Sequence, residues 1–510
     1  MTRRRTACAA ARCVRPGGCD LEHAIVLGTK GLMNRRNFLK FIGASIAGTL
    51  CPESRRNERA NATAVRTSSA KPNFVVILCD NLGYGDIACL GSKAHRTPHI
   101  DQLAREGMCL RSFYCSSPVC TPSRASLMTG CYAQRVDMHI SDKGGWVLRP
   151  VSAKGLNPNE ITIAEILKGC GYATACLGKW HLGDQPEFLP TRHGFDDYLG
   201  IPYSEDMVPA HTPSWPPLPL LHNEVVVEAP VDLASTTRRY VDKATRFIRA
   251  NRDKPFFLYF AHHLPGSTKV PDVDPRFRGK SKNGRYGDSV EEIDWSVGQI
   301  MDELKRLGID DDTLVVFTSD NGTPPGKGGS NAPWGGWAYS TSEGGMRMPC
   351  IVRWPGEVPM GTSCDELCTM MDLLPTFAGL AGSAAPKDRV IDGKDIRPIL
   401  SGTADVESPH EVFYYYMAEQ LQAVRAGKWK LHLPLETMRG EAAHRPMKLI
   451  DLSTDLQEAH DLSEDYPRVV QRLTTFANKA RAELGDLGRP GRGRRPAGSV
   501  ARPKALLIVR

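Results

Sequence analysis

Long hydrophobic runs are scarce in this sequence of 510 residues. The apolar run in the N-terminal segment covers only residues 41–50, whereas a membrane-spanning helix needs about 20 consecutive apolar residues. That run is therefore too short to be a stable bilayer anchor. Hydrophobic residues make up 41% and charged residues 24% of the chain, which is an ordinary composition for a globular protein with one large domain and a smaller one.

The main body of the chain also lacks a net positive charge, although the whole sequence has a net charge of +8. Residues 1–60 contribute +8 and residues 489–510 contribute +7, so residues 61–488 carry a net charge of −7. A nucleic-acid-binding protein presents a basic face on its folded part. We therefore expect no nucleic-acid partner.

A regular cysteine framework is absent as well. The fifteen cysteines are irregularly spaced, and the chain is too long to be a small disulfide-stapled scaffold. Cys364 and Cys368 stand four residues apart, but the sequence offers no partners that would complete a zinc site. We expect most of the cysteines to be small buried apolar residues.

Two arginines directly precede the short apolar run. Arg35 and Arg36 stand in the sequence NRRNFLK, just before residues 41–50. Twin arginines before a moderate hydrophobic stretch resemble a bacterial twin-arginine export signal. We expect residues 1–70 to be a leader and linker that the twin-arginine export machinery reads, which predicts a periplasmic or extracellular location in a bacterium. An accidental arginine pair in a tail is the alternative.

From residue 72 onward, short apolar runs alternate with helical patterns. Four runs predict strands that are buried on both faces: residues 74–78, 172–177, 256–260 and 314–317. Residues 288–307 predict a helix, because apolar residues recur there at three- and four-residue spacing. The alternation predicts an α/β domain over residues 71–389, with a mostly parallel sheet and helices on both faces.

The pattern changes near residue 390. Residues 424–431 and 447–451 predict short strands around turns, and residues 465–484 predict a helix. We expect residues 390–488 to form a smaller α+β domain. The last segment, residues 489–510, is rich in Gly, Pro and Arg, so we expect a basic disordered tail.

Polar residues follow each of the four apolar runs. They are Asp80 and Asn81 after the first run, Lys179 and His181 after the second, His262 and His263 after the third, and Asp320 and Asn321 after the fourth. Ligands of open α/β sheets bind beyond the carboxyl ends of the strands. The sequence therefore predicts one site that collects these side chains.

The two Asp-Asn pairs supply hard oxygen donors. Such donors suit Ca²⁺ or Mg²⁺ and suit zinc poorly, because no thiol or imidazole cluster accompanies them. An Asp-Asn pair also forms turns readily, so each pair alone has that simpler explanation. Both pairs together with the next motif favour a metal site.

The segment Cys120–Arg124 has the form C-x-P-x-R and is followed by ASLMTG. Together with GKWHLG after the second run and SDNG after the fourth, it resembles the motifs of type I, formylglycine-dependent sulfatases, which are arylsulfatase-like members of the alkaline-phosphatase-like superfamily. The likeness runs from Asn73 to about Gly345, and Lys448–Leu462 resembles the usual C-terminal signature of these enzymes.

The resemblance implies a modified nucleophile and a metal. In such sulfatases, C-x-P-x-R is the signal by which a formylglycine-generating enzyme oxidises the cysteine, here Cys120, and the hydrated aldehyde attacks the sulfur of a sulfate ester. A divalent cation, Ca²⁺ or Mg²⁺, assists the reaction. The ligands that the resemblance implies are Asp80, Asn81, Cys120 in its modified form, Asp320 and Asn321.

The resemblance also assigns roles to residues around the nucleophile. Arg124 would hold the aldehyde hydrate by charge-assisted hydrogen bonds. Pro122 fits the first turn of a helix whose N-terminus faces the anion. Lys179 would bind a sulfate oxygen, His181 would orient the hydrate, and Ser204 would make a further polar contact with the substrate.

The chain departs from the family pattern at three positions. Asn81 stands where the first metal motif usually has a second aspartate. Gly266 stands where a histidine usually protonates the leaving oxygen, and His263 or His262 either replaces that histidine or only fills the edge of the sheet. Ala338 stands where a lysine usually binds sulfate, and the loss of such a cation costs several kcal/mol of transition-state stabilisation.

Two functions remain open at this point. The first is hydrolysis of sulfate esters, either aryl sulfates or sulfated carbohydrates, for which Trp334, Trp337 and Tyr339 are a candidate sugar-binding surface unless they belong to the core. The second is a sulfatase-like binding protein with low or no turnover, which Gly266 and Ala338 motivate. A phosphoryl-transfer enzyme of the same fold has no use for the oxidation motif.

Overall fold

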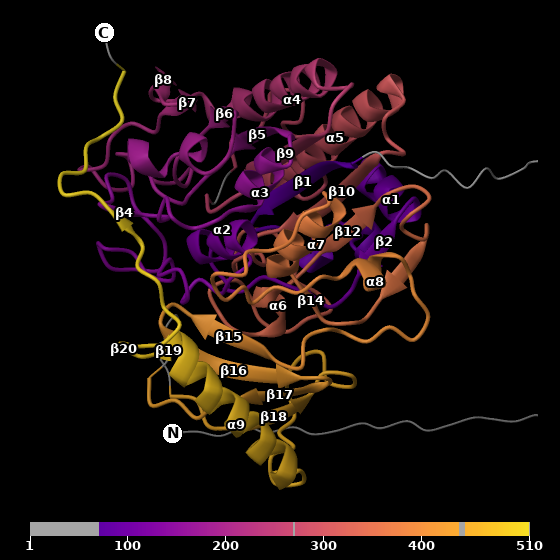
Figure 1. Ribbon diagram of the computed structural model, residues 1–510, viewed down its shortest axis with the longest axis vertical. Coiled ribbons are helices and arrows are strands. Elements are labelled where there is room, and N and C mark those ends of the chain that lie inside the picture. The colour runs from indigo at the N-terminus through magenta and orange to yellow at the C-terminus, as the bar shows by residue number, and fades with distance from the viewer. Residues whose placement is uncertain (1–70, 269–270, 438–443, 509–510) are drawn as a thin grey trace, which may run out of the picture. The chain divides into compact units, whose positions relative to one another are not determined.

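The computed structural model describes residues 71–268, 271–437 and 444–508, all within one unit of the chain, Thr67–Arg510. The leader and linker expected in residues 1–70 lie outside the described residues. Helices and strands alternate along the first three quarters of the described chain (Figure 1). In the described residues, no helix combines the length and apolar character that a membrane span requires.

A sheet of ten strands lies at the centre of the larger domain, in the order β13-β2-β12-β10-β1-β9-β5-β6-β7-β8. The five strands in its middle run parallel to one another. They are β1 (Asn73–Asp80), β5 (Ala173–Gly178), β6 (Asp197–Gly200), β9 (Phe256–Pro265) and β10 (Thr313–Ser319). The outer strands are β2 (Met108–Leu110), β7 (Leu220–His222), β8 (Val225–Glu228), β12 (Cys350–Arg353) and β13 (Thr362–Cys364).

Helices cover both faces of this sheet because the side chains of β1 alternate between two apolar clusters. Phe74, Val76 and Leu78 belong to the cluster on one face, and Val75 and Ile77 to the cluster on the other. The first face carries α2 (Cys120–Thr129), α3 (Ile163–Gly169) and α7 (Leu373–Leu380). The second face carries α1 (Pro98–Arg105), α4 (Leu233–Ala250) and α5 (Gly284–Leu307).

The predicted α/β class is therefore confirmed. The four apolar runs form β1, β5, β9 and β10, and the helix expected over residues 288–307 begins four residues earlier, at Gly284. It ends where Gly308 adopts a left-handed conformation with φ 68°, as a C-terminal glycine cap requires.

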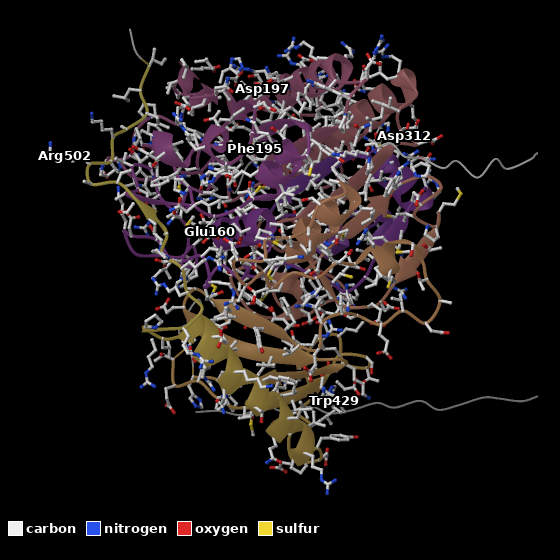
Figure 2. All side chains as sticks on the ribbon, viewed as in Figure 1. Glu160, Phe195, Asp197, Asp312, Trp429 and Arg502 are labelled. Atoms are coloured by element: carbon white, nitrogen blue, oxygen red, sulfur yellow. The ribbon has the colours of Figure 1, made fainter. Side chains whose placement is uncertain are left out.

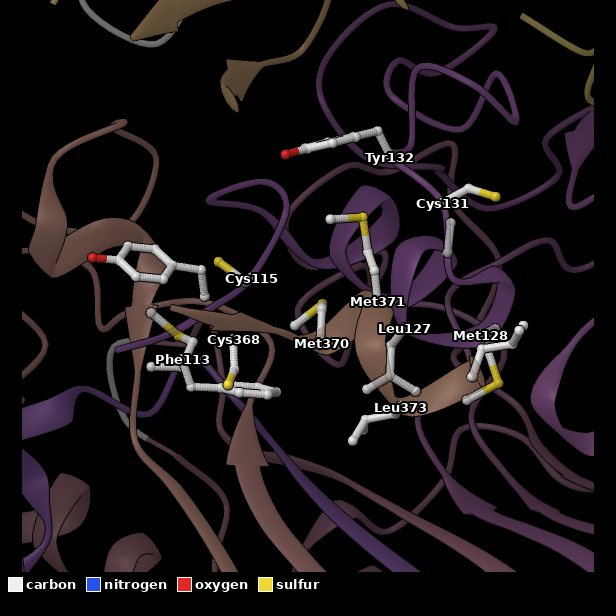
Figure 3. Close-up of a cluster of buried hydrophobic side chains, with 14 of the residues drawn as sticks. Phe113, Cys115, Leu127, Met128, Cys131, Tyr132, Cys368, Met370, Met371 and Leu373 are labelled. Carbon is white, nitrogen blue, oxygen red and sulfur yellow. The ribbon is translucent and has the colours of Figure 1, made fainter. Parts of the chain in front are cut away.

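Helix α2 is buried along its whole length. Its apolar side contacts η5 (Met370–Asp372) and α7, and Figure 3 shows Leu127 and Met128 of α2 beside Met370, Met371 and Leu373. Burial of this apolar face fixes α2 against the sheet, since such contacts contribute about 25 cal/mol per Å² of apolar surface. The N-terminus of α2 is thereby held at the sheet edge.

A second, smaller sheet follows in the C-terminal part of the chain, as expected. Its strands are β15 (Phe413–Met417), β16 (Gln420–Ala426), β17 (Trp429–His432) and β18 (Lys448–Asp451), and α9 (Pro467–Leu484) packs on it (Figure 1). The shorter remaining elements are β3 (Phe113–Tyr114), β4 (Lys154–Gly155), α6 (Glu343–Met346), β11 (Arg347–Met348), β14 (Cys368–Thr369) and α8 (Arg397–Leu400). The domain boundaries drawn after residues 389 and 488 stay predictions.

Residues 489–508 correct the expectation of a disordered tail. The segment forms β20 (Arg489–Pro490), which pairs with β19 (Gly485–Asp486), and β21 (Gly498–Ser499), which pairs with β4 of the larger domain. Arg495 makes a two-pronged ion pair with Glu160, at 2.7 and 2.9 Å. Backbone pairing and a partly buried ion pair therefore order this segment, although its composition is typical of disordered chains.

We predict that Arg495→Ala lowers the free energy of unfolding by about 2 kcal/mol, because Glu160 is only 4% exposed and would lose its main hydrogen-bond donor. Chemical denaturation monitored by fluorescence measures this. Arg502→Ala is the matched control, because Arg502 is exposed at the edge of the molecule (Figure 2) and makes no ion pair with the described residues. Equal stabilities of the two variants would contradict the prediction.

Candidate active site

The predicted site residues meet at the carboxyl ends of four parallel strands. Asp80 ends β1, Lys179 follows β5, His263 lies near the end of β9, and Asp320 follows β10. The N-terminus of α2 adds Cys120 and Arg124 from the face that carries α3 and α7 (Figure 1).

Arg124 lies between the two aspartates. Its guanidinium donates to Asp80 Oδ1 at 3.2 Å and to Asp320 Oδ2 at 3.0 Å, and a third hydrogen bond of 2.8 Å reaches the carbonyl of Lys179. The side chains of Arg124, Asp80 and Asp320 are all fully buried. A guanidinium that bridges two carboxylates satisfies its donors while it neutralises their repulsion.

Lys179 contributes a second buried cation. Its Nζ lies 2.9 Å from Asp80 Oδ2, 2.9 Å from Ser204 Oγ, 3.5 Å from Glu205 Oε2 and 3.8 Å from Cys120 Sγ. Burial would lower the pKa of Lys179, but the negative charge of Asp80 and Glu205 raises the pKa well above its ordinary value. Lys179 is therefore a permanent positive charge beside Cys120. The predicted contact residue Ser204 accepts a hydrogen bond from the same ammonium group.

Cys120 is 4% exposed and opens α2. Burial raises the pKa of the Cys120 thiol well above its ordinary value, and the carboxylate of Asp80 raises it further. A thiolate, not a thiol, is the nucleophilic form of cysteine. The surroundings of Cys120 therefore disfavour direct thiolate catalysis.

The donors near Cys120 fit a hard divalent cation. Ligand atoms of Asp80, Cys120 and Asp320 all lie within 4.8 Å of one another. Asn321 Oδ1 is buried and has no hydrogen-bond partner, while the amide of Asn321 donates to Asn81 Oδ1. An unpartnered buried carbonyl next to two carboxylates is the donor chemistry that Ca²⁺ and Mg²⁺ prefer.

Burial raises the pKa of Asp80 to about 6, and the cations of Lys179 and Arg124 only partly oppose the shift. The raised pKa indicates that burial penalises the ionised form of Asp80 by more than its two cations compensate. A further positive charge at this point stabilises the ionised form of Asp80. The residues present therefore fit the predicted cation.

His181 presents one free acceptor. Its backbone is left-handed, with φ 61°, and its ring Nε2 lies 3.0 Å from the carbonyl of Leu148. Because a carbonyl only accepts, Nε2 carries the proton and Nδ1 is an acceptor. Nδ1 is buried without a partner, and Thr121, next to Cys120, donates to the backbone carbonyl of His181. This places an unused acceptor beside the start of α2.

The two histidines of β9 face opposite sides of the sheet. His262 Nε2 lies 2.9 Å from Ser296 Oγ on α5, so His262 fills the sheet edge away from the site. His263 is 1% exposed, and neither of its ring nitrogens has a hydrogen-bond partner. Burial lowers the pKa of His263 to about 4, and the charge of Asp80 acts in the opposite direction. His263 thus lies at the site as a neutral, deeply buried ring.

Gly266, the position of the expected histidine, has no room for a side chain. It has φ 80°, and a Cβ atom there would lie 2.5 Å from Glu205 Oε1. Glu205 accepts from the backbone N–H of Ser267 and from Ser204 Oγ. The carboxylate of Glu205 therefore occupies the space beside Gly266. No periodic pattern pointed to Glu205 or Ser267, since both stand in irregular segments.

Ser267 is half-buried and contacts Asn81 and Lys327 besides Glu205. Its Oγ accepts from Asn81 Nδ2 at 3.1 Å, and its carbonyl accepts from Lys327 Nζ at 2.7 Å. Lys327 makes no ion pair with a carboxylate in the part of the chain that the structure describes. Ala338 is buried, as expected for a residue without a charge, and its neighbour Tyr339 is half-buried. Lys327 is thus a cation that the sequence pattern alone did not reveal.

Comparison with known proteins agrees with this geometry. Residues 72–383 match the model of the sulfatase family, and residues 337–483 match the model of the C-terminal region of N-sulphoglucosamine sulphohydrolase. The chain belongs to the sulfatase family. This places it in the alkaline-phosphatase-like superfamily, as the motifs predicted.

Named sulfatases align with most of the chain. Steryl-sulfatase of Mus musculus is 36% identical over 86% of this chain and 84% of its own length, and arylsulfatase A of Homo sapiens is 37% identical over 79% and 86%. The crystal structure of Ps i-CgsB superimposes with a TM-score of 0.70 at 30% identity, covering 80% of this chain and 92% of its own. The chain is thus a sulfatase enzyme that hydrolyses sulfate esters.

We predict that Arg124→Met lowers the free energy of unfolding by about 3–5 kcal/mol, because it leaves two buried carboxylates uncompensated. Denaturation in the presence of a chelator, at a pH above the raised pKa of Asp80, measures the effect. Arg472→Met is the control, because its pair with Glu411 at 3.7 Å is exposed and such surface pairs contribute at most about 1 kcal/mol. A stable Arg124→Met protein would show that Arg124 does not hold the two aspartates.

Proposed function

We propose that this sulfatase acts through formylglycine made from Cys120. The observation that carries this proposal is the placement of Cys120, the first residue of the C-x-P-x-R segment, at the N-terminus of α2, with its Sγ 3.8 Å from Lys179 Nζ and within 4.8 Å of ligand atoms of Asp80 and Asp320. Burial raises the pKa of the Cys120 thiol, so the unmodified thiol is a poor nucleophile there. Formylglycine supplies instead a hydrated aldehyde, whose oxygen attacks sulfur and whose second hydroxyl later allows sulfate to leave.

The side chains of the site would have different roles in the reaction. Lys179 and the N–H groups at the start of α2 bind the sulfate oxygens, since a preformed cation and a helix N-terminus stabilise developing negative charge without reorganisation. Arg124 holds Asp80 and Asp320 in place by buried ion pairs. His181 Nδ1, the free acceptor, holds a hydroxyl proton at position 120.

We propose Ca²⁺ as the metal, with Mg²⁺ as the alternative. Asp80, Asn81, Asp320, Asn321 and the modified residue 120 would hold it, because carboxylate and amide oxygens are its preferred ligands. Bound there, the cation would polarise the sulfate group. Asn81 in place of an aspartate reduces the negative charge of the ligand set by one, which favours weaker binding.

We propose sulfated carbohydrates as the substrates, with aryl sulfates as model substrates. Support comes from relatives: N-acetylgalactosamine-6-sulfatase of Canis lupus familiaris is 38% identical over 71% of this chain, and Ps i-CgsB has been solved in complex with k-i-k-neocarrahexaose. Trp337 is 41% exposed on the loop that precedes Glu343, where an aromatic face is available for a sugar ring.

A binding protein without turnover is not favoured. It was motivated by Gly266 and Ala338, but Glu205 fills the space at Gly266, and Lys327 brings a cation to the same side of the pocket.

We also propose export by the twin-arginine route, which the sequence of residues 34–50 supports. Export in the folded state fits oxidation of Cys120 in the cytoplasm before transport.

We predict that co-expression with a formylglycine-generating enzyme converts Cys120 to the aldehyde and yields sulfate release from aryl and sugar sulfates. Peptide mass spectrometry of the tryptic fragment and an ion-chromatography assay for sulfate measure the two results. Cys120→Ala should abolish release, whereas Cys89→Ala, which removes an exposed thiol away from the site, should leave it unchanged.

Two outcomes would count against this mechanism. A fully active protein with an unmodified thiol at position 120 would exclude the aldehyde. A quantitatively modified protein that releases sulfate from no substrate of a broad panel of sulfated sugars would restore the binding-protein alternative.

We further predict that Ca²⁺ raises the melting temperature of the unmodified thiol form and that a chelator reverses the rise, because ligand binding to the native state alone stabilises it. Differential scanning calorimetry with a calcium titration measures this without any turnover. Asn321→Ala should abolish the calcium effect, and Asn283→Ala, a surface amide that bonds His95 and Gly328, should retain it. An unchanged calcium effect in Asn321→Ala would place the ion elsewhere.

A further inference from the structure

The buried cations of the active site already form ion pairs with carboxylates. Arg124 contacts Asp80 and Asp320, and Lys179 contacts Asp80 and Glu205. These contacts suit them to binding the sulfate group and the metal carboxylates. Cleavage of an alkyl sulfate also needs a proton for the bridging oxygen, because an alkoxide is a poor leaving group.

Neither expected proton donor is placed to supply that proton. Gly266 has no side chain, and its Cβ position is taken by the carboxylate of Glu205. His263 is 1% exposed within β9, where it is closed off from the solvent that would have to return a proton to it. The leaving alcohol of a sulfate ester points away from the nucleophile, toward solvent.

Tyr339 is half-buried and has a strained backbone conformation. Its φ is 69°, a left-handed value that is costly for a bulky residue and persists only where other contacts hold it. Its backbone N–H donates to the carbonyl of Pro118 at 3.1 Å, two residues before Cys120. Its ring lies 6.0 Å from the ring of Trp146. These contacts hold the half-buried side chain beside the start of α2.

The phenolic hydroxyl of Tyr339 interacts with the side chain of Ser267. Burial raises the pKa of Tyr339, the nearby charge of Cys120 and of Asp80 raises it further, and the side chain of Ser267 opposes the shift. The hydroxyl is therefore protonated at neutral pH, as a proton donor must be. Ser267 in turn contacts Asn81, and its carbonyl holds Lys327.

We propose that the Tyr339 hydroxyl is the proton donor to the bridging oxygen of the leaving alcohol. The proposal rests on the sulfatase chemistry proposed for position 120. As sulfur gains its bond to the nucleophile, its bond to the bridging oxygen breaks, the bonding pair stays on that oxygen, and the oxygen takes the phenolic proton. The tyrosinate is then reprotonated by water at its exposed side, and the Lys327 ammonium at Ser267 favours the transient negative charge.

The test compares two leaving groups in the aldehyde-bearing protein. Tyr339→Phe removes only the hydroxyl and should lower kcat/KM for a sugar sulfate by roughly 100-fold, the scale of general acid catalysis. It should leave kcat/KM for 4-nitrophenyl sulfate nearly unchanged, because nitrophenolate leaves without a proton. Tyr172→Phe is the matched control, because the Tyr172 hydroxyl is buried without a partner in the apolar cluster behind α3, and both rates should persist.

A second readout does not depend on turnover. Calorimetry of the unmodified thiol form with the uncleaved sugar sulfate should give nearly equal affinities for the wild-type protein and for Tyr339→Phe, since the proton is transferred only in the transition state. A large loss of affinity would assign Tyr339 to substrate binding and overturn the proposal.

Three kinetic outcomes separate the alternatives. An equal loss of rate on both substrates would show a positioning role and would refute proton donation by Tyr339. Leaving-group dependence that appears in His263→Gln instead of Tyr339→Phe would assign the proton to His263. A modified wild-type protein that cleaves neither substrate would overturn the proposed mechanism itself, and this role with it.

Discussion

The active site depends on one guanidinium placed between two buried carboxylates. Asp80 and Asp320 end neighbouring parallel strands, and both are fully buried. Two such charges repel each other strongly in a medium of low dielectric constant unless a cation lies between them. Arg124 supplies that cation from α2, so the helix must dock with this residue at the sheet edge. Cys120 stands four residues earlier on the same helix, and its place beside Lys179 follows from the same docking.

A second buried charge cluster anchors the loop that carries Tyr339. Glu343 begins α6 directly after this loop and is fully buried, as is its partner Lys430 of β17 at 3.0 Å. The hydroxyl of Tyr415 on β15 also donates to Glu343, at 2.9 Å. An uncompensated carboxylate at this depth would cost several kcal/mol. The C-terminal sheet therefore helps to set the geometry of the pocket through the charge on Glu343.

The parts of the site that the sequence predicted share one physical origin. Continuous apolar runs are readable as buried parallel strands, and parallel strands deliver their following residues to one edge, which brings Asp80, Lys179 and Asp320 together. Glu205 escaped prediction because its partners depend on the path of irregular segments. The ordered C-terminal segment escaped because Gly, Pro and Arg suggest disorder, while its partners, β4 and Glu160, lie more than 300 residues earlier.

The departure at Gly266 is coupled to the position of Glu205 and is not a simple loss. A side chain at Gly266 would collide with Glu205 Oε1 at 2.5 Å and would have to adopt φ 80°, which is costly for any residue with a Cβ atom. The carboxylate of Glu205 is fixed in turn by Lys179 and Ser267. A histidine at position 266 and the carboxylate of Glu205 in its present place therefore exclude each other. The pocket has a different construction around Ser267, Lys327 and Tyr339, and the missing histidine alone does not argue against turnover.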